Sequence, residues 1–131
     1  VLQARGVEAF NAGRVAEAET LFAESLALLP FHYGHLVEVA QVKALIGKWG
    51  EAEELFVRAI RVRPGGAPAY TFWSARLLAG GQPDAARRIA AAGLGRVEPT
   101  TRLWALIADS WEAEGQTAES LRARAAAGRM D

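Results

Sequence analysis

A spacing of 34 residues recurs along the chain and constrains its fold more than any other feature of the sequence. Shifting the sequence by 34 residues superimposes glycines, small residues and apolar residues on residues of the same kind. Because several columns agree at once, the match is stronger than any single Gly or Ala column. A repeat of this length indicates stacked copies of one small structural unit. The agreeing columns are Gly13, Gly47, Gly81 and Gly115; Ala18, Ala52 and Ala86; Leu21, Leu55 and Ile89; and Phe22 with Phe56.

Each unit divides into two helices at its glycine. Glycine is favoured where a helix ends in a left-handed cap. Acidic residues such as Glu17 and Glu51 follow within the next turn, where they complement the positive end of a new helix. The second helices are expected to close before Pro30, Pro64 and Pro99, since proline disfavours the α conformation of the preceding residue.

These signals predict eight helices, over 1–12, 15–28, 33–46, 49–62, 67–80, 83–96, 100–114 and 117–127. Pro83 suits the first position of its helix, and Thr117 suits an N-cap. Ala is abundant and β-branched residues are few, which also favours helix over sheet. The sequence therefore predicts an all-α protein without an internal linker.

At the repeat positions the chain resembles the tetratricopeptide repeat (TPR) family, through patterns such as Gly13-x-x-x-x-Ala18-x-x-x-Phe22 and Gly47-x-x-x-x-Ala52-x-x-x-Phe56. The resemblance covers essentially the whole chain. It implies a right-handed α-solenoid, a single array over 1–131 with four repeats at about 1–32, 33–66, 67–100 and 101–131.

The third and fourth repeats depart from the family pattern. Ala90 stands where the pattern has an aromatic residue, and Pro99 falls one residue late, so looser packing is expected there. Ser120, Arg124 and Ala127 occupy apolar positions of the last repeat. Its second helix is either a polar cap or a truncated end, and we favour the cap. Because less apolar area is buried, the C-terminal end is expected to be less stable.

In the resembled family the first helix of each repeat lines a concave face that binds other proteins. The resemblance thus implies a non-catalytic scaffold or adaptor that holds a peptide or helix of a partner protein in this groove. The implied partner-binding residues are Gln3, Val7, Phe10, Asn11, Val37, Glu38, Gln41, Leu45, Thr71, Phe72, Leu78, Arg102, Leu106, Asp109 and Glu112. Self-association or docking onto another part of a longer chain is the alternative, and enzymatic activity is the least favoured one.

Some members of the family bind the free C-terminal carboxylate of chaperone tails through Lys and Asn side chains. This chain has Gln3, Val7, Glu38, Pro68 and Phe72 at the corresponding places. Glu38 would repel a carboxylate. Binding of chaperone tails is therefore not expected.

Neighbouring Phe72 and Trp73 are expected to have opposite roles, because adjacent helical residues point about 100° apart. Trp73 falls in a packing column with Val39 and Ile107, whereas Phe72 falls on the groove wall with Glu38 and Leu106. The other tryptophans, Trp49, Trp104 and Trp111, also occupy packing columns. They are therefore interpreted as core residues and not as a ligand cage.

The sequence offers little for catalysis or metal binding. It has two histidines and four serines, and no nucleophile stands in a recognisable motif. His32 and His35 are three apart, but two imidazoles alone make a poor zinc site, and we interpret them as partly exposed residues at a helix start. Gly65 and Gly66 lack the Lys-Ser or Lys-Thr of a phosphate loop and are read as a turn. We expect no cofactor and no metal.

Composition limits the partners and the cellular setting that the chain can have. Fifteen basic and fifteen acidic residues balance, so no net charge attracts nucleic acid, and Arg87, Arg88, Arg122, Arg124 and Arg129 are expected on a solvated outer surface. No cysteine is present, and no apolar run approaches the roughly 18 residues of a membrane span. The chain is expected to be soluble, and the cytoplasm is slightly favoured over other compartments. Because it begins at Val1, we expect a segment of a longer protein.

Overall fold

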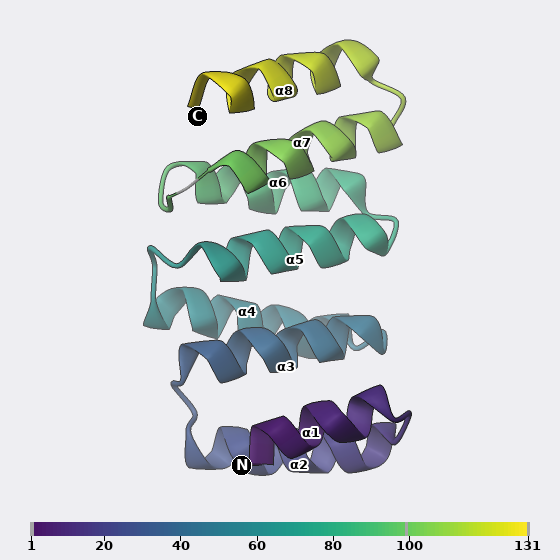
Figure 1. Ribbon diagram of the computed structural model, residues 1–131, viewed down its shortest axis with the longest axis vertical. Coiled ribbons are helices and arrows are strands. Elements are labelled where there is room, and N and C mark those ends of the chain that lie inside the picture. Colours follow the sequence, from purple (N-terminus) through teal and green to yellow (C-terminus); the bar gives the residue numbers. More distant parts are fainter. Residues whose placement is uncertain (1, 99, 131) are drawn as a thin grey trace.

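The computed structural model describes residues 2–98 and 100–130 of the chain. Within these ranges it contains eight α-helices and no strand (Figure 1). The helices are α1 (Leu2–Asn11), α2 (Val15–Leu28), α3 (Tyr33–Leu45), α4 (Trp49–Val62), α5 (Ala67–Ala79), α6 (Pro83–Leu94), α7 (Thr101–Ala113) and α8 (Thr117–Met130). The all-α prediction is confirmed.

Consecutive helices run in opposite directions and form hairpins that stack along one long axis (Figure 1). In Figure 1, α1, α3, α5 and α7 lie in front, and α2, α4 and α6 lie behind them. The main contacts join the two helices of each hairpin and also α6 with α7, and α3, α5 and α7 contact one another in sequence. The fold is therefore a two-layered α-solenoid, as the 34-residue spacing predicted.

The turns within the hairpins depend on the four superimposed glycines. Gly13, Gly47, Gly81 and Gly115 have φ angles of 82°, 84°, 78° and 77°, and no other described residue has a positive φ. An L-residue with a Cβ would be strained in this left-handed region. The repeated glycine thus ends the first helix of each hairpin, and its prediction is confirmed.

Two of the predicted helix ends differ from the structure by more than one residue, and one predicted cap is wrong. Thr117 is the first residue of α8 and not its N-cap, and α8 extends to Met130, beyond the predicted end at residue 127. The helix α6 ends at Leu94, with Gly95 as its C-cap, so its end lies well before Pro99. Pro99 itself lies outside the described residues.

The core between the layers is filled differently along the stack. Phe22 and Phe56 are fully enclosed in the first two hairpins, and Trp73 stacks on Phe56 with ring centroids 5.5 Å apart. All four tryptophans are partly buried and pack against the core, as predicted: Trp49 and Trp73 against one cluster, Trp104 and Trp111 against a second. Trp73 therefore belongs to the core while Phe72 does not.

The third hairpin packs tightly, and the expectation of looser packing there is wrong. Ala90, which replaces the aromatic residue, is completely buried. A Cβ added at Gly93 would lie 2.9 Å from Leu103 Cδ1 and 3.0 Å from Tyr70 Cγ. Since small side chains let neighbouring helices approach, α6 lies directly against α7 and Tyr70.

The last helix is attached mainly by small and polar residues. Its buried side chains include Ser120 and Ala123, while Leu121 is 63% exposed. Ser120 Oγ donates a hydrogen bond to Glu112 on α7. Arg124 donates to Asp109 at 3.0 Å and to Glu112 at 2.9 Å. These contacts agree with the favoured interpretation of this helix as a polar cap.

None of the described helices combines the length and apolar character that crossing a bilayer requires.

Candidate protein-binding surface

The residues assigned to the groove lie on α1, α3, α5 and α7, and we call the surface of these four helices the odd-helix face. Most of its assigned side chains are partly or well exposed, including Leu45 at 54% and Phe72 at 40%. Val37 and Leu106 are exceptions, with 5% and 2% exposure. Both side chains pack into the core clusters, so little of either is open to a partner, although Val37 also lines the hollow described next.

An open hollow of about 550 Å³ lies on this face between α3 and α5. Phe72 and Pro68 line it from α5, and Glu38 and Gln41 line it from α3. The remaining lining residues are Tyr33, Gly34, Val37 and Arg63. The hollow combines an exposed aromatic ring with a carboxylate and an amide, which suits a ligand having both apolar and polar groups.

One end of the hollow is held in place by Tyr33. Its hydroxyl accepts a hydrogen bond from the Ala69 amide at 2.9 Å and donates one to the Gly66 carbonyl at 3.1 Å. A Cβ at Gly66 would lie 2.6 Å from this hydroxyl, so the position accommodates only glycine without rearrangement. Arg63 lies over the Tyr33 ring, 4.8 Å from its centroid. This network ties the start of α3 to the start of α5.

The sequence analysis did not assign Tyr33 and Arg63 to the groove. Arg63 follows α4, a second helix of a hairpin, and enters the hollow because the chain turns there toward α5. The only local signal was the adjacent Gly65-Gly66 turn, which was correctly read as a turn. What it did not reveal is that Gly66 makes room for a tyrosine 33 residues earlier.

Glu38 is the acidic group of the hollow. It is partly buried, and Gln3 on α1 donates a hydrogen bond to its carboxylate. Burial raises the pKa of Glu38, and the hydrogen bond from Gln3 opposes that rise. A ligand that brings a hydrogen-bond donor or a positive charge would stabilise the ionised carboxylate.

The odd-helix face changes character toward the C-terminus. Asp109 and Glu112, both assigned to the groove, are held by Arg124 of α8. The pKa of Glu112 is lowered, chiefly by its hydrogen bond from Arg124 and then by Ser120. Their carboxylates are thus already partnered within the chain. The part of the face best suited to a ligand is the one formed by α1, α3 and α5.

The two histidines are not equivalent. His32 is exposed and caps α3, since its Nδ1 accepts a hydrogen bond from the His35 amide at 3.1 Å. His35 is buried, 3.2 Å from the Ser25 hydroxyl, so its expected partial exposure is a wrong prediction. Burial lowers the pKa of His35, with a smaller effect of His32 in the same direction. In the described part of the chain, no three His, Cys, Asp or Glu side chains are grouped to hold a metal ion.

Arg87 also differs from its prediction as a solvated surface residue. Its guanidinium lies over the Trp111 ring, 3.5 Å from the centroid, and donates hydrogen bonds to Ser110 and Glu114. The side chain is only 15% exposed. Arg87 therefore fastens α6 to α7, whereas Arg88 and Arg122 remain solvated with 71% exposure.

No family model and no curated protein sequence matches the chain. Solved structures of MamA do match. "MamA MSR-1 C2" is 21% identical with a TM-score of 0.72, over 99% of this chain and 75% of that one. "Crystal structure of MamA" is 18% identical with a TM-score of 0.76, over 98% and 75%. "MamA RS-1 ArsTM double mutant" is 18% identical with a TM-score of 0.73, over 99% and 73%. Likeness at these identities shows the fold alone, a TPR-like α-solenoid.

Proposed function

We propose that the chain is a non-catalytic scaffold that binds a peptide or helix of a partner protein on the odd-helix face. The observation that carries this proposal is the hollow between α3 and α5, where the exposed ring of Phe72 stands beside Glu38 and Gln41. An aromatic ring that is 40% exposed on a folded surface gains free energy when a ligand covers it.

The chemistry of the hollow suggests what the ligand carries. Phe72 and Pro68 favour an apolar side chain on the ligand. Glu38 favours a lysine, an arginine or another hydrogen-bond donor one helical turn further along the ligand. Gln41 offers an amide that both donates and accepts. The proposed ligand is therefore a segment with a large apolar residue next to a basic one.

The lining of the hollow favours binding over chemistry. It includes one carboxylate, that of Glu38, and one guanidinium, that of Arg63, which lies over the Tyr33 ring. Acid–base catalysis needs a second group positioned to exchange a proton with substrate, and nucleophilic catalysis needs a base beside the nucleophile. The balance of fifteen acidic and fifteen basic residues further favours protein over nucleic acid as the partner.

A peptide-display selection against the 131-residue chain tests the proposal. Selected peptides are expected to share an apolar residue next to a basic one. Phe72→Ala should weaken their binding at least about tenfold, consistent with loss of a central aromatic contact. Glu38→Gln should weaken the basic peptides selectively.

Leu121→Ala is the matched control, because Leu121 is also an exposed apolar residue but lies on α8, outside the hollow. It should leave peptide binding unchanged. If Phe72→Ala and Leu121→Ala bind the selected peptides equally well, the hollow is not the binding site and the proposal fails.

A further inference from the structure

The back layer carries a second surface, formed by the outward side of α4. Its residues are Gly50, Glu53, Glu54, Val57, Arg58 and Arg61, which we call the α4 stripe. Their spacing of three and four residues places them on one side of the helix. The opposite side of α4 buries Ala52, Leu55, Phe56 and Ala59 in the core. The α4 stripe therefore faces away from the core and surrounds an open hollow of about 570 Å³.

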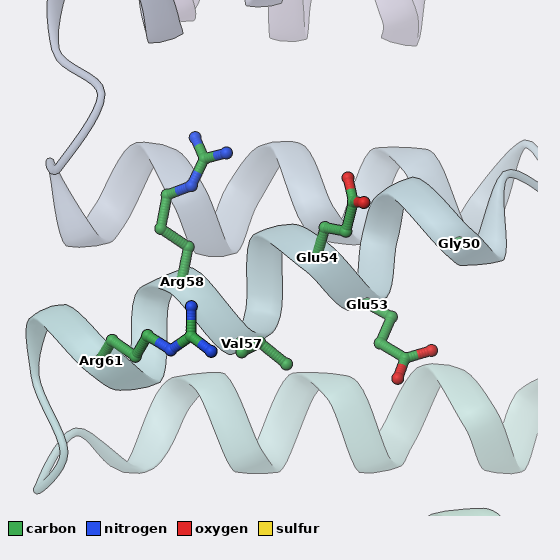
Figure 2. Close-up of a pocket in the computed structure, with 6 residues that line it drawn as sticks. All are labelled: Gly50, Glu53, Glu54, Val57, Arg58 and Arg61. Carbon is green, nitrogen blue, oxygen red and sulfur yellow. The ribbon is translucent and has the colours of Figure 1, made fainter.

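The charges of the α4 stripe are sorted along the helix. Glu53 and Glu54 stand in its first half and Arg58 and Arg61 in its second half, with Val57 between them (Figure 2). All four charged residues are exposed, and Val57 is partly buried. One end of the stripe is thus acidic and the other basic.

These four charges have no partner within the described part of the chain: no ion pair or hydrogen bond engages any of them. Other charged residues of the back layer are paired, for example Glu19 with Lys43 and Lys48, and Arg87 with Asp84. A stripe of unpaired, ordered charges is available to a partner whose charges run in the opposite order.

The fold itself does not require this order of charges. Acidic residues near a helix start and basic ones near its end complement the helix dipole, but α2 and α6 carry only the acidic residue, Glu17 or Asp84, and no basic residue in the last turn. The 34-residue register gives Glu19, Thr20, Glu24 and Ala27 at the equivalent positions of α2, and Arg87, Arg88, Ala92 and Gly95 at those of α6. The acidic-then-basic order belongs to α4 alone among these three helices.

We propose that the α4 stripe is a homodimer contact, with a second copy of this chain as its partner. Glu53 lies one turn before Val57, and Arg61 lies one turn after it. When two copies of α4 cross antiparallel at Val57, each Glu53 faces the Arg61 of the partner copy. The same two-fold rotation brings Glu54 level with position 60 of the partner copy, between its Arg58 and Arg61. A single surface that complements itself in this way forms a closed, symmetric pair.

Close approach of the two helices is sterically open at Gly50. A Cβ built there would meet no atom within 4 Å, and the residue is exposed. The contact is small because it uses one helix face, below the area of a standard interface. The dimer is therefore expected to be weak, with a dissociation constant on the order of 100 µM. A dimer through α4 leaves the odd-helix face free, so this proposal does not depend on the proposed function.

Sedimentation equilibrium of the 131-residue chain tests the dimer. The weight-average mass should rise from 14.0 kDa toward twice that value across the concentration range around the dissociation constant. Raising the salt from about 0.1 M to about 1 M shortens the Debye length from about 10 Å to about 3 Å and should shift the dimer toward monomer. A wild-type mass of 14.0 kDa at all concentrations would overturn the proposal.

Charge reversal provides the decisive comparison. The double variant Glu53→Arg with Glu54→Arg, and the double variant Arg58→Glu with Arg61→Glu, should each be monomeric, because like charges then meet. An equimolar mixture of the two should form a heterodimer at lower concentration than the wild type dimerises, since one stripe is then wholly basic and the other wholly acidic. The control Glu8→Arg with Glu98→Arg changes the net charge as the Glu53→Arg, Glu54→Arg variant does, but at exposed positions outside the stripe, and should dimerise as the wild type does.

Two results would contradict the proposed pairing. One is dimerisation of either double variant alone at wild-type concentrations, and the other is a mixture that stays monomeric. Circular dichroism melts of each variant establish that the helices remain folded, as expected from four exposed side chains.

Discussion

Two regions of the stack fill the space between neighbouring helices with different kinds of residue. In the first two hairpins, one column of the 34-residue spacing holds Phe22 and Phe56, whose rings are fully enclosed. In the last two hairpins the same column holds Ala90 and Arg124. Ala90 is buried because α6 comes close to α7, and Arg124 reaches out to Asp109 and Glu112. The interface between helices can thus be closed by a ring, by closer backbones or by ion pairs.

The comparison teaches that a missing aromatic residue does not by itself loosen the packing. A small residue helps when the neighbouring helix moves in, as the contacts at Gly93 with Tyr70 and Leu103 indicate. The stability of the two regions should nevertheless differ, because burying a large ring removes more apolar area from water than burying alanine.

The largest effect is expected on the aromatic side of the comparison. Trp73→Ala removes the ring that stacks on Phe56 and should cost about 3 to 5 kcal/mol of unfolding free energy, the usual range for large core truncations. Phe72→Ala, one residue earlier and 40% exposed, should cost less than about 1 kcal/mol. Urea denaturation of both variants gives the comparison. Equal losses would show that the two side chains do not occupy opposite faces.

The next effect tests the close approach in the third hairpin. Gly93→Ala should destabilise the chain by about 1 to 3 kcal/mol, because the added methyl group would overlap Leu103 and Tyr70. This loss has the opposite sign to the increase in stability of about 1 kcal/mol that alanine normally gives over glycine in a helix. Gly50→Ala is the matched control, since it has open space and should show the helix gain alone. A Gly93→Ala variant as stable as Gly50→Ala would contradict the tight packing.

A smaller, local difference is expected between α8 and α4. Over 117–128, where burial in α8 is described, Ser120 and Ala123 are the buried residues, whereas α4 buries Leu55 and Phe56. Amide hydrogens in 117–127 should therefore exchange faster than those in 49–62, because less apolar contact opposes local opening. Hydrogen exchange followed by mass spectrometry measures this directly. Slower exchange in α8 would remove the basis for calling it the weaker end.

The smallest effect is expected at Arg124. The ion pairs of Arg124 with Asp109 and Glu112 are exposed, and such pairs contribute little because water and salt screen them. Arg124→Ala should lower the unfolding midpoint slightly at low salt, and high salt should abolish the difference. Arg122→Ala is the control on the same helix, since its partner Glu119 lies within α8. If Arg124→Ala lowers the unfolding free energy as much as Trp73→Ala does, Arg124 contributes to stability as a core residue does.

The sequence by itself determined the helices and their turns. The left-handed glycines from Gly13 to Gly115 and the prolines after α2 and α4 act on their own neighbours in the chain, so the helix ends could be read locally. The opposite placement of Phe72 and Trp73 also followed from helix geometry and the repeat register alone. These features depend on backbone conformation and on residues no more than a few positions away.

Only the tertiary structure decided which side chains reach solvent. Leu106 and His35 were placed on accessible surfaces but are buried among neighbouring helices. Arg87 was assigned to solvent but lies on Trp111. Tyr33 and Arg63 complete the hollow through partners that no local pattern indicates. The physical reason is that exposure and pairing depend on the distance between helices, and here that distance is set by small residues such as Gly66 and Gly93, whose neighbours lie in other helices.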